Sequence, residues 1–97
     1  TSESLLLSDL VTRRMSHEPI QYLTGKWDFL DFTLNMEAPL LCPRPETEEL
    51  VERVIKDSQT SPSNILDIGC GTGCIGIALA KRFVTSTVDA IDVESTA

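Results

Sequence analysis

A run of glycines after an apolar segment is the part of the chain best suited to chemistry. Residues 65–68 are apolar except for Asp67, and glycines then occupy positions 69, 71 and 73. This order predicts a buried strand, a turn and the beginning of a helix. Glycine lets the backbone approach a ligand closely, and a helix N-terminus adds free N–H groups and positive dipole character. We therefore expect a nucleotide-binding site at this turn.

A carboxylate stands at the end of the next predicted strand, which covers residues 87–93. Asp92 follows the glycines by about 20 residues, the spacing typical of an acidic residue that binds ribose hydroxyls. Strand, turn, helix and strand together predict half of a mononucleotide-binding α/β unit.

The glycine pattern admits two kinds of ligand. Residues 71–76 match the G-x-G-x-x-G pattern of nicotinamide and flavin binders, but the glycines already begin at Gly69, directly after the strand. Asp67 also places a carboxylate where a pyrophosphate would be repelled and where an ammonium and a sulfonium would be attracted. Those are the properties of S-adenosylmethionine, which we predict as the cofactor. A nicotinamide-dependent oxidoreductase remains the alternative.

The elements that must position this turn follow from hydrophobic periodicity. The segment over residues 26–36 alternates apolar and polar side chains and predicts a β-hairpin that turns near Leu30. We expect it to lie between the first helix and the α/β part. The other predicted elements are a helix over residues 3–15, a helical turn over 18–23, a helix capped by Thr47 that runs to about residue 57, strands over 65–68 and 87–93, and a helix over 74–83.

Two prolines flank Arg44 and predict a rigid, extended loop just before the third helix. Proline fixes its own φ and restricts the residue before it, so the Arg44 side chain has a fixed direction. Surface loops carry function more often than core segments do.

Composition excludes several functional classes. The 97 residues carry a net charge of −7 with scattered basic residues, so we expect no direct nucleic-acid partner. No apolar run approaches the ~20 residues that span a bilayer, so we expect no membrane partner. The three cysteines, Cys42, Cys70 and Cys74, fit no zinc spacing, so we expect reduced thiols and no metal. We also expect a monomer and no catalytic role for His17.

The wider sequence resembles a known family. Residues 67–73, Asp-Ile-Gly-Cys-Gly-Thr-Gly, resemble motif I of class I methyltransferases. Residues 18–25, Trp27-Asp28-Phe29 and residues 43–52 resemble the HemK (PrmC) family of protein-(glutamine) methyltransferases. The resemblance implies an α/β, Rossmann-like class I methyltransferase fold, preceded by a helical segment and a β-hairpin. It divides the chain into a helical substrate-recognition part (1–25), a hairpin linker (26–40) and the start of the S-adenosylmethionine-binding domain (41–97).

The resemblance also implies a reaction and its residues. The reaction is S-adenosylmethionine-dependent methylation of the glutamine side-chain amide in the Gly-Gly-Gln motif of peptide-chain release factors. The implied cofactor-binding residues are Asp67, Gly69, Cys70, Gly71, Thr72, Gly73 and Asp92. The implied active-site loop comprises Pro43, Arg44, Pro45, Glu46, Thr47 and Glu48.

The Asn-Pro-Pro-Tyr motif with which this family holds the substrate amide does not occur in the chain. We therefore expect an N-terminal piece of a longer enzyme, truncated after the second strand, with no catalytic residue of its own and no activity alone. A methyltransferase of the same fold with another substrate and a non-catalytic truncated isoform are the alternatives. We expect a mitochondrial location, with the cytoplasm as the alternative.

Overall fold

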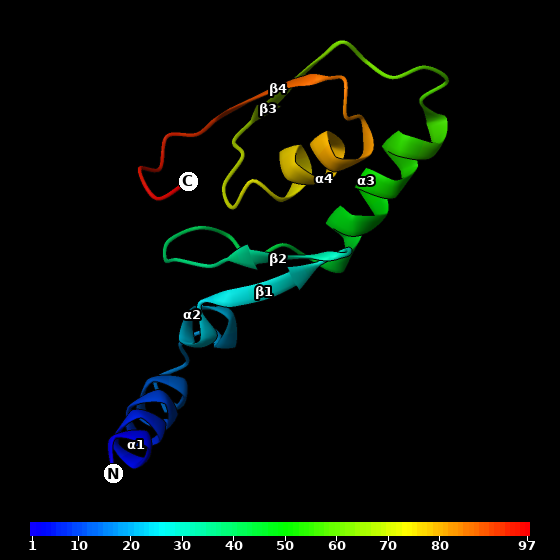
Figure 1. The fold of residues 1–97 in the computed structure, drawn as a ribbon. Helices are drawn as coiled ribbons and strands as arrows, with labels where there is room; N and C mark the ends of the chain where they lie inside the picture. Colours follow the sequence, from blue (N-terminus) through cyan, green and yellow to red (C-terminus); the bar gives the residue numbers. More distant parts are fainter.

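The computed structural model describes residues 1–97 and contains helices at both ends of a β-hairpin, followed by a parallel strand pair (Figure 1). In chain order the elements are α1 (Ser2–Met15), α2 (Ile20–Thr24), β1 (Lys26–Phe29), β2 (Phe32–Asn35), α3 (Pro45–Asp57), β3 (Asn64–Ile68), α4 (Cys74–Arg82) and β4 (Thr87–Ile91). This mixture of helices and strands agrees with the predicted α/β class.

Strands β3 and β4 form the parallel pair, in register from Asn64 opposite Thr87 to Ile68 opposite Ile91. Helix α4 connects them and packs on one face of the pair, where Figure 1 shows it between β3–β4 and the hairpin. Strand β4 ends at Ile91, two residues earlier than the sequence predicts, because the chain turns there to bring the Asp92 carboxylate back towards the glycines.

The hydrophobic core lies between the hairpin and helices α3 and α4. Phe29 from β1 and Val51 from α3 are each 1% exposed. The remaining members of this core are Leu34, Met36, Cys74, Ala78, Leu79 and Phe83. The segment that the sequence predicts as a linker therefore contributes three core side chains, and its alternating pattern places them on one face.

Polar contacts hold the tip of the hairpin against both helices. Leu30 has a φ of 52°, and its backbone N–H donates to Glu48 Oε2 over 2.8 Å. From α4, Lys81 Nζ lies 3.6 Å from Asp31 Oδ1 and 5.1 Å from the centre of the Phe32 ring. The hairpin turns at Leu30 and Asp31, as the sequence predicts, and its strands pair antiparallel from Lys26 opposite Asn35 to Phe29 opposite Phe32.

Helix α1 projects away from this core (Figure 1) and buries none of its residues. The hairpin lies between α1 and the α/β part, as predicted. The Arg13 guanidinium joins the end of α1 to the following segment through two 2.7 Å hydrogen bonds to the Glu18 carboxylate. None of the helices combines the length and the apolar character that crossing a membrane requires.

Helix α3 begins earlier than the sequence predicts. Its N-cap is Arg44, and Pro45 occupies the first turn, whereas we expected Thr47 to cap the helix. Proline suits the first helical position because its φ is already helical and it has no N–H to satisfy. The Thr47 N–H instead donates to the Arg44 carbonyl over 2.9 Å. Of the six residues of the predicted active-site loop, Pro43 and Arg44 therefore precede the helix, and the other four form its first turn.

Candidate functional site

The glycine turn is a tightly bonded loop that joins β3 to α4. Gly69, Gly71 and Gly73 have φ values of 71°, 53° and 84°, a region that other residues enter only at a cost. The N–H groups of Gly69 and Cys70 both donate to the Ile91 carbonyl, over 2.8 and 3.1 Å. The turn is therefore fixed against the end of β4, and both strands contribute to one site.

Asp92, the residue directly after β4, supports this turn. Its Oδ2 accepts the Gly71 N–H over 2.7 Å, and its Oδ1 accepts the Glu94 N–H over 2.8 Å. The hydrogen bonds from the Glu94 and Gly71 backbones lower the pKa of the Asp92 carboxyl below its ordinary value. Asp92 is therefore ionised at neutral pH and keeps lone pairs that can accept hydrogen bonds from the hydroxyls of a ligand.

A cleft of about 460 Å³ opens beside the turn, within the size range of small-molecule sites. One wall consists of residues 69–72 with Asp92 and Glu94, and the other consists of residues 39–44. We call it the glycine-turn cleft. It brings together eight of the predicted site residues, namely Gly69, Cys70, Gly71, Thr72, Asp92, Pro43, Arg44 and Thr47. It is not lined by Asp67, Gly73, Pro45, Glu46 or Glu48.

Asp67 lies beneath the turn. It is 9% exposed, and its Oδ2 accepts the Gly76 N–H of α4 over 3.1 Å. A Cβ atom at Gly76 would come within 3.1 Å of that oxygen and 3.5 Å of Val88 Cγ1. Glycine at this position therefore lets α4 lie directly on the strand pair. The hydrogen bond from the Gly76 N–H shows that Asp67 of β3 helps to hold α4 against the strand pair.

All three cysteines line the glycine-turn cleft, which the sequence analysis did not predict for Cys42 and Cys74. The thiols are free. Burial raises the pKa of Cys42 and, as the largest of several influences, that of Cys74. Cys42 directly precedes the Pro-Arg-Pro segment. This neighbourhood is the one feature of the sequence that could have predicted that Cys42 lies at the site. No group of three or more His, Cys, Asp and Glu side chains is arranged to hold a metal ion.

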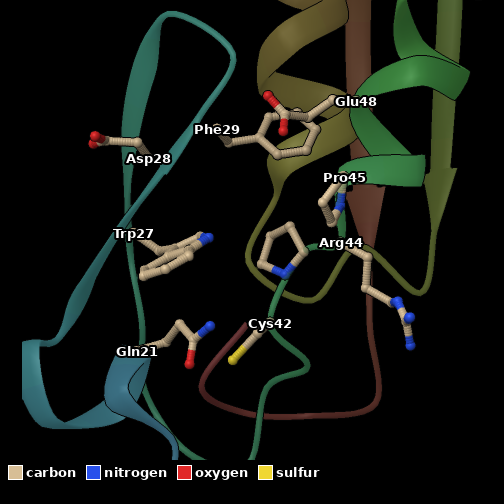
Figure 2. Close-up of a pocket in the computed structure, with 9 residues that line it drawn as sticks. Gln21, Trp27, Asp28, Phe29, Cys42, Arg44, Pro45 and Glu48 are labelled. Carbon is tan, nitrogen blue, oxygen red and sulfur yellow. The ribbon is translucent and has the colours of Figure 1, made fainter.

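A second cleft of about 470 Å³ lies on the other side of the Pro-Arg-Pro segment (Figure 2). We call it the hairpin cleft. Gln21 of α2 and Trp27 of β1 form one side, and Pro45 and Glu48 of α3 contribute to the other. Cys42, Pro43 and Arg44 line both clefts. One short segment therefore separates the glycine-turn cleft from the hairpin cleft.

The glycine-turn cleft suits a polar ligand bound largely by backbone. A Cβ atom added at Gly69 or Gly71 would meet no other atom within 4 Å, so this stretch of backbone faces open space. Asp92 supplies negative charge beside it, and the Arg44 guanidinium is 3.5 Å from Glu46 Oε2. This combination fits a ligand with hydroxyls and positive charge.

Comparison with known proteins gives a consistent assignment. The profile of the Methyltransferase small domain family matches residues 46–97. The human MTRF1L release factor glutamine methyltransferase is 41% identical, over 95% of this chain and 30% of its own length. Release factor glutamine methyltransferases of Streptococcus pneumoniae (38% identical, 98% of this chain and 34% of the relative) and Flavobacterium psychrophilum (46%, 82% and 30%) are also similar.

The chain spans about a third of the length of these curated relatives. Their names confirm the resemblance to the HemK family, and the profile match covers more than half of the residues. The chain belongs to the Methyltransferase small domain family.

Proposed function

We propose that the full-length protein transfers a methyl group from S-adenosylmethionine to the glutamine amide in the Gly-Gly-Gln motif of a peptide-chain release factor. The observation that carries the proposal is the glycine-turn cleft, which joins the glycine backbone, the ionised Asp92 and the Pro-Arg-Pro segment in one place. The names of the curated relatives support release factors as the substrate class.

Each part of the cleft has a distinct role in this proposal. The turn backbone over residues 69–72 contacts the cofactor, and Asp92 accepts hydrogen bonds from its ribose hydroxyls. Asp67 acts through α4, because its carboxylate holds the Gly76 N–H and so fixes the start of the helix behind the turn. When bound, S-adenosylmethionine supplies an electrophilic methyl group on a sulfonium.

The site must also orient the methyl acceptor, which is the amide nitrogen of the substrate glutamine. An amide nitrogen is a weak nucleophile because its lone pair is delocalised. The site must therefore hold the amide in line with the methyl group, an orientation effect worth several kcal/mol. Cys42, Pro43 and Arg44 line both clefts, so they can shape the approach of the acceptor.

Two measurements on the full-length protein test the proposal. Titration calorimetry should show binding of S-adenosylhomocysteine and none of NAD, and Asp92→Ala should weaken that binding at least about 10-fold. Mass spectrometry should find one added methyl group on the glutamine of a release factor, which a Gln→Ala substrate should lack. Binding of NAD alone would favour the oxidoreductase alternative, and methylation of a different protein would favour another substrate.

For the compartment we propose the mitochondrion, with the cytoplasm as the alternative, because a human protein is among the relatives. Imaging of the tagged full-length protein in cells distinguishes the two.

A further inference from the structure

We propose that the hairpin cleft binds an extended, non-acidic segment of the protein substrate next to the residue that is methylated. This inference rests on the proposed function, because it takes the glycine-turn cleft as the cofactor site. Its first support is position. Cys42, Pro43 and Arg44 line both clefts, so a polypeptide in the hairpin cleft lies one short segment away from the cofactor.

The second support is the chemistry of the lining. Trp27 is 39% exposed although tryptophan is the largest apolar side chain in the chain, and Figure 2 shows its ring facing the cleft opposite the proline segment. Half-exposed tryptophans in pockets are frequent anchors of protein–protein contacts. Rings of tryptophan and proline form a flat apolar slot, which fits an extended main chain and small side chains.

The third support is a set of polar groups whose hydrogen-bonding capacity is not used up within the chain. The Gln21 amide and the Trp27 indole N–H form no intramolecular hydrogen bond, and Glu48 uses only Oε2, which accepts the Leu30 N–H. Together they offer donors and acceptors that match the N–H and C=O groups of a peptide. Such groups at the edge of an apolar slot fix the orientation of a bound chain.

The charge of the hairpin cleft limits which peptide segments can bind there. Glu48 supplies a carboxylate to the cleft, whereas the Arg44 guanidinium points away from it in Figure 2 and pairs with Glu46. Asp28 also contributes to the lining, but its carboxylate points outward in Figure 2 and accepts the Thr33 hydroxyl over 2.9 Å. The chain as a whole carries a net charge of −7. An acidic segment would therefore be repelled, and a neutral or basic one would be accepted.

Steady-state kinetics of the full-length protein on a release factor test the inference. Trp27→Ala should raise the KM for the release factor about 10-fold or more and Gln21→Ala about 3-fold, with the affinity for S-adenosylhomocysteine unchanged. Ile20→Ala is the matched control, since Ile20 is an exposed residue of the same short helix that lines neither cleft. It should leave both values unchanged. Unchanged KM values in both Trp27→Ala and Gln21→Ala would overturn the inference.

Fluorescence gives a second readout that does not depend on turnover. A tryptophan-free peptide that contains the acceptor glutamine should change the emission of the wild-type protein, and the change should be absent in Trp27→Phe. The same peptide with glutamates beside the acceptor should give a smaller change than one with lysines. No Trp27-dependent change would count against the inference. Wild-type turnover without these effects would refute the peptide site alone, whereas absence of turnover and of cofactor binding would refute the proposed function.

Discussion

Replacing single glycines of the turn separates its role in folding from its role in binding. Gly71 has a φ of 53°, and an added Cβ would meet nothing within 4 Å. Gly71→Ala therefore carries only the cost of a left-handed alanine, about 1 kcal/mol of unfolding free energy. Its methyl group would, however, project from a residue that lines the glycine-turn cleft. We expect it to weaken S-adenosylhomocysteine binding at least about 10-fold, or about 1.4 kcal/mol.

Gly73→Ala is the matched comparison on the same turn. Gly73 has a φ of 84°, and an added Cβ would lie 3.3 Å from Ile77 Cδ1. The left-handed backbone and this close contact together predict a loss of about 2 kcal/mol in unfolding free energy. Gly73 does not line the cleft, so its loss of affinity should be the smaller of the two.

Urea unfolding followed by circular dichroism and calorimetric titration with S-adenosylhomocysteine measure the two effects in the full-length protein. We expect opposite rankings for the two variants: Gly71→Ala should lose more affinity, and Gly73→Ala should lose more unfolding free energy. If Gly71→Ala binds as tightly as wild type, the turn backbone does not contact the ligand and the site is wrongly placed.

Three further predictions concern the supports of the site. Glu48→Ala should lower the unfolding free energy by about 1.5–3 kcal/mol in urea denaturation, because it leaves the Leu30 N–H without its charged acceptor, and Glu48→Gln should lose less. Phe29→Ala should cost about 3–5 kcal/mol in the same assay, because Phe29 is 1% exposed in the core shared by the hairpin, α3 and α4. The pKa of Asp92 is lowered in the folded state, so its stabilising contribution is complete above the unfolded value and disappears as pH falls through the folded value. Acid titration of stability should therefore be shallower in Asp92→Asn than in wild type, and parallel curves would contradict this sign.

Local sequence signals predicted the parts of the fold that local chemistry determines. The hairpin turn at Leu30 followed from period-two alternation, and the strand–turn–helix followed from glycines directly after an apolar run. The start of α3 was predicted three residues too late because Thr47 is a good capping residue. The preference of Pro45 for the first helical position decided the boundary instead.

Contacts between distant residues could not be predicted in this way. The pairing of Asp67 with the Gly76 N–H depends on how closely α4 approaches β3. The convergence of Cys42 with Cys70 and Cys74 depends on the path of residues 37–44 across the turn. That path is fixed from outside the segment, where the Tyr22 hydroxyl donates to the Leu40 carbonyl. The pattern of residues within the segment itself therefore does not predict that contact.

The position of Cys42, Pro43 and Arg44 as a wall common to both clefts has a thermodynamic consequence. A ligand that shifts this segment on one side changes the shape of the cavity on the other side. The resulting coupling free energy is reciprocal, so each ligand must alter the affinity of the other by the same factor. Two prolines limit how far the segment can bend, and they therefore favour a concerted displacement of the wall over independent adjustment of its two faces.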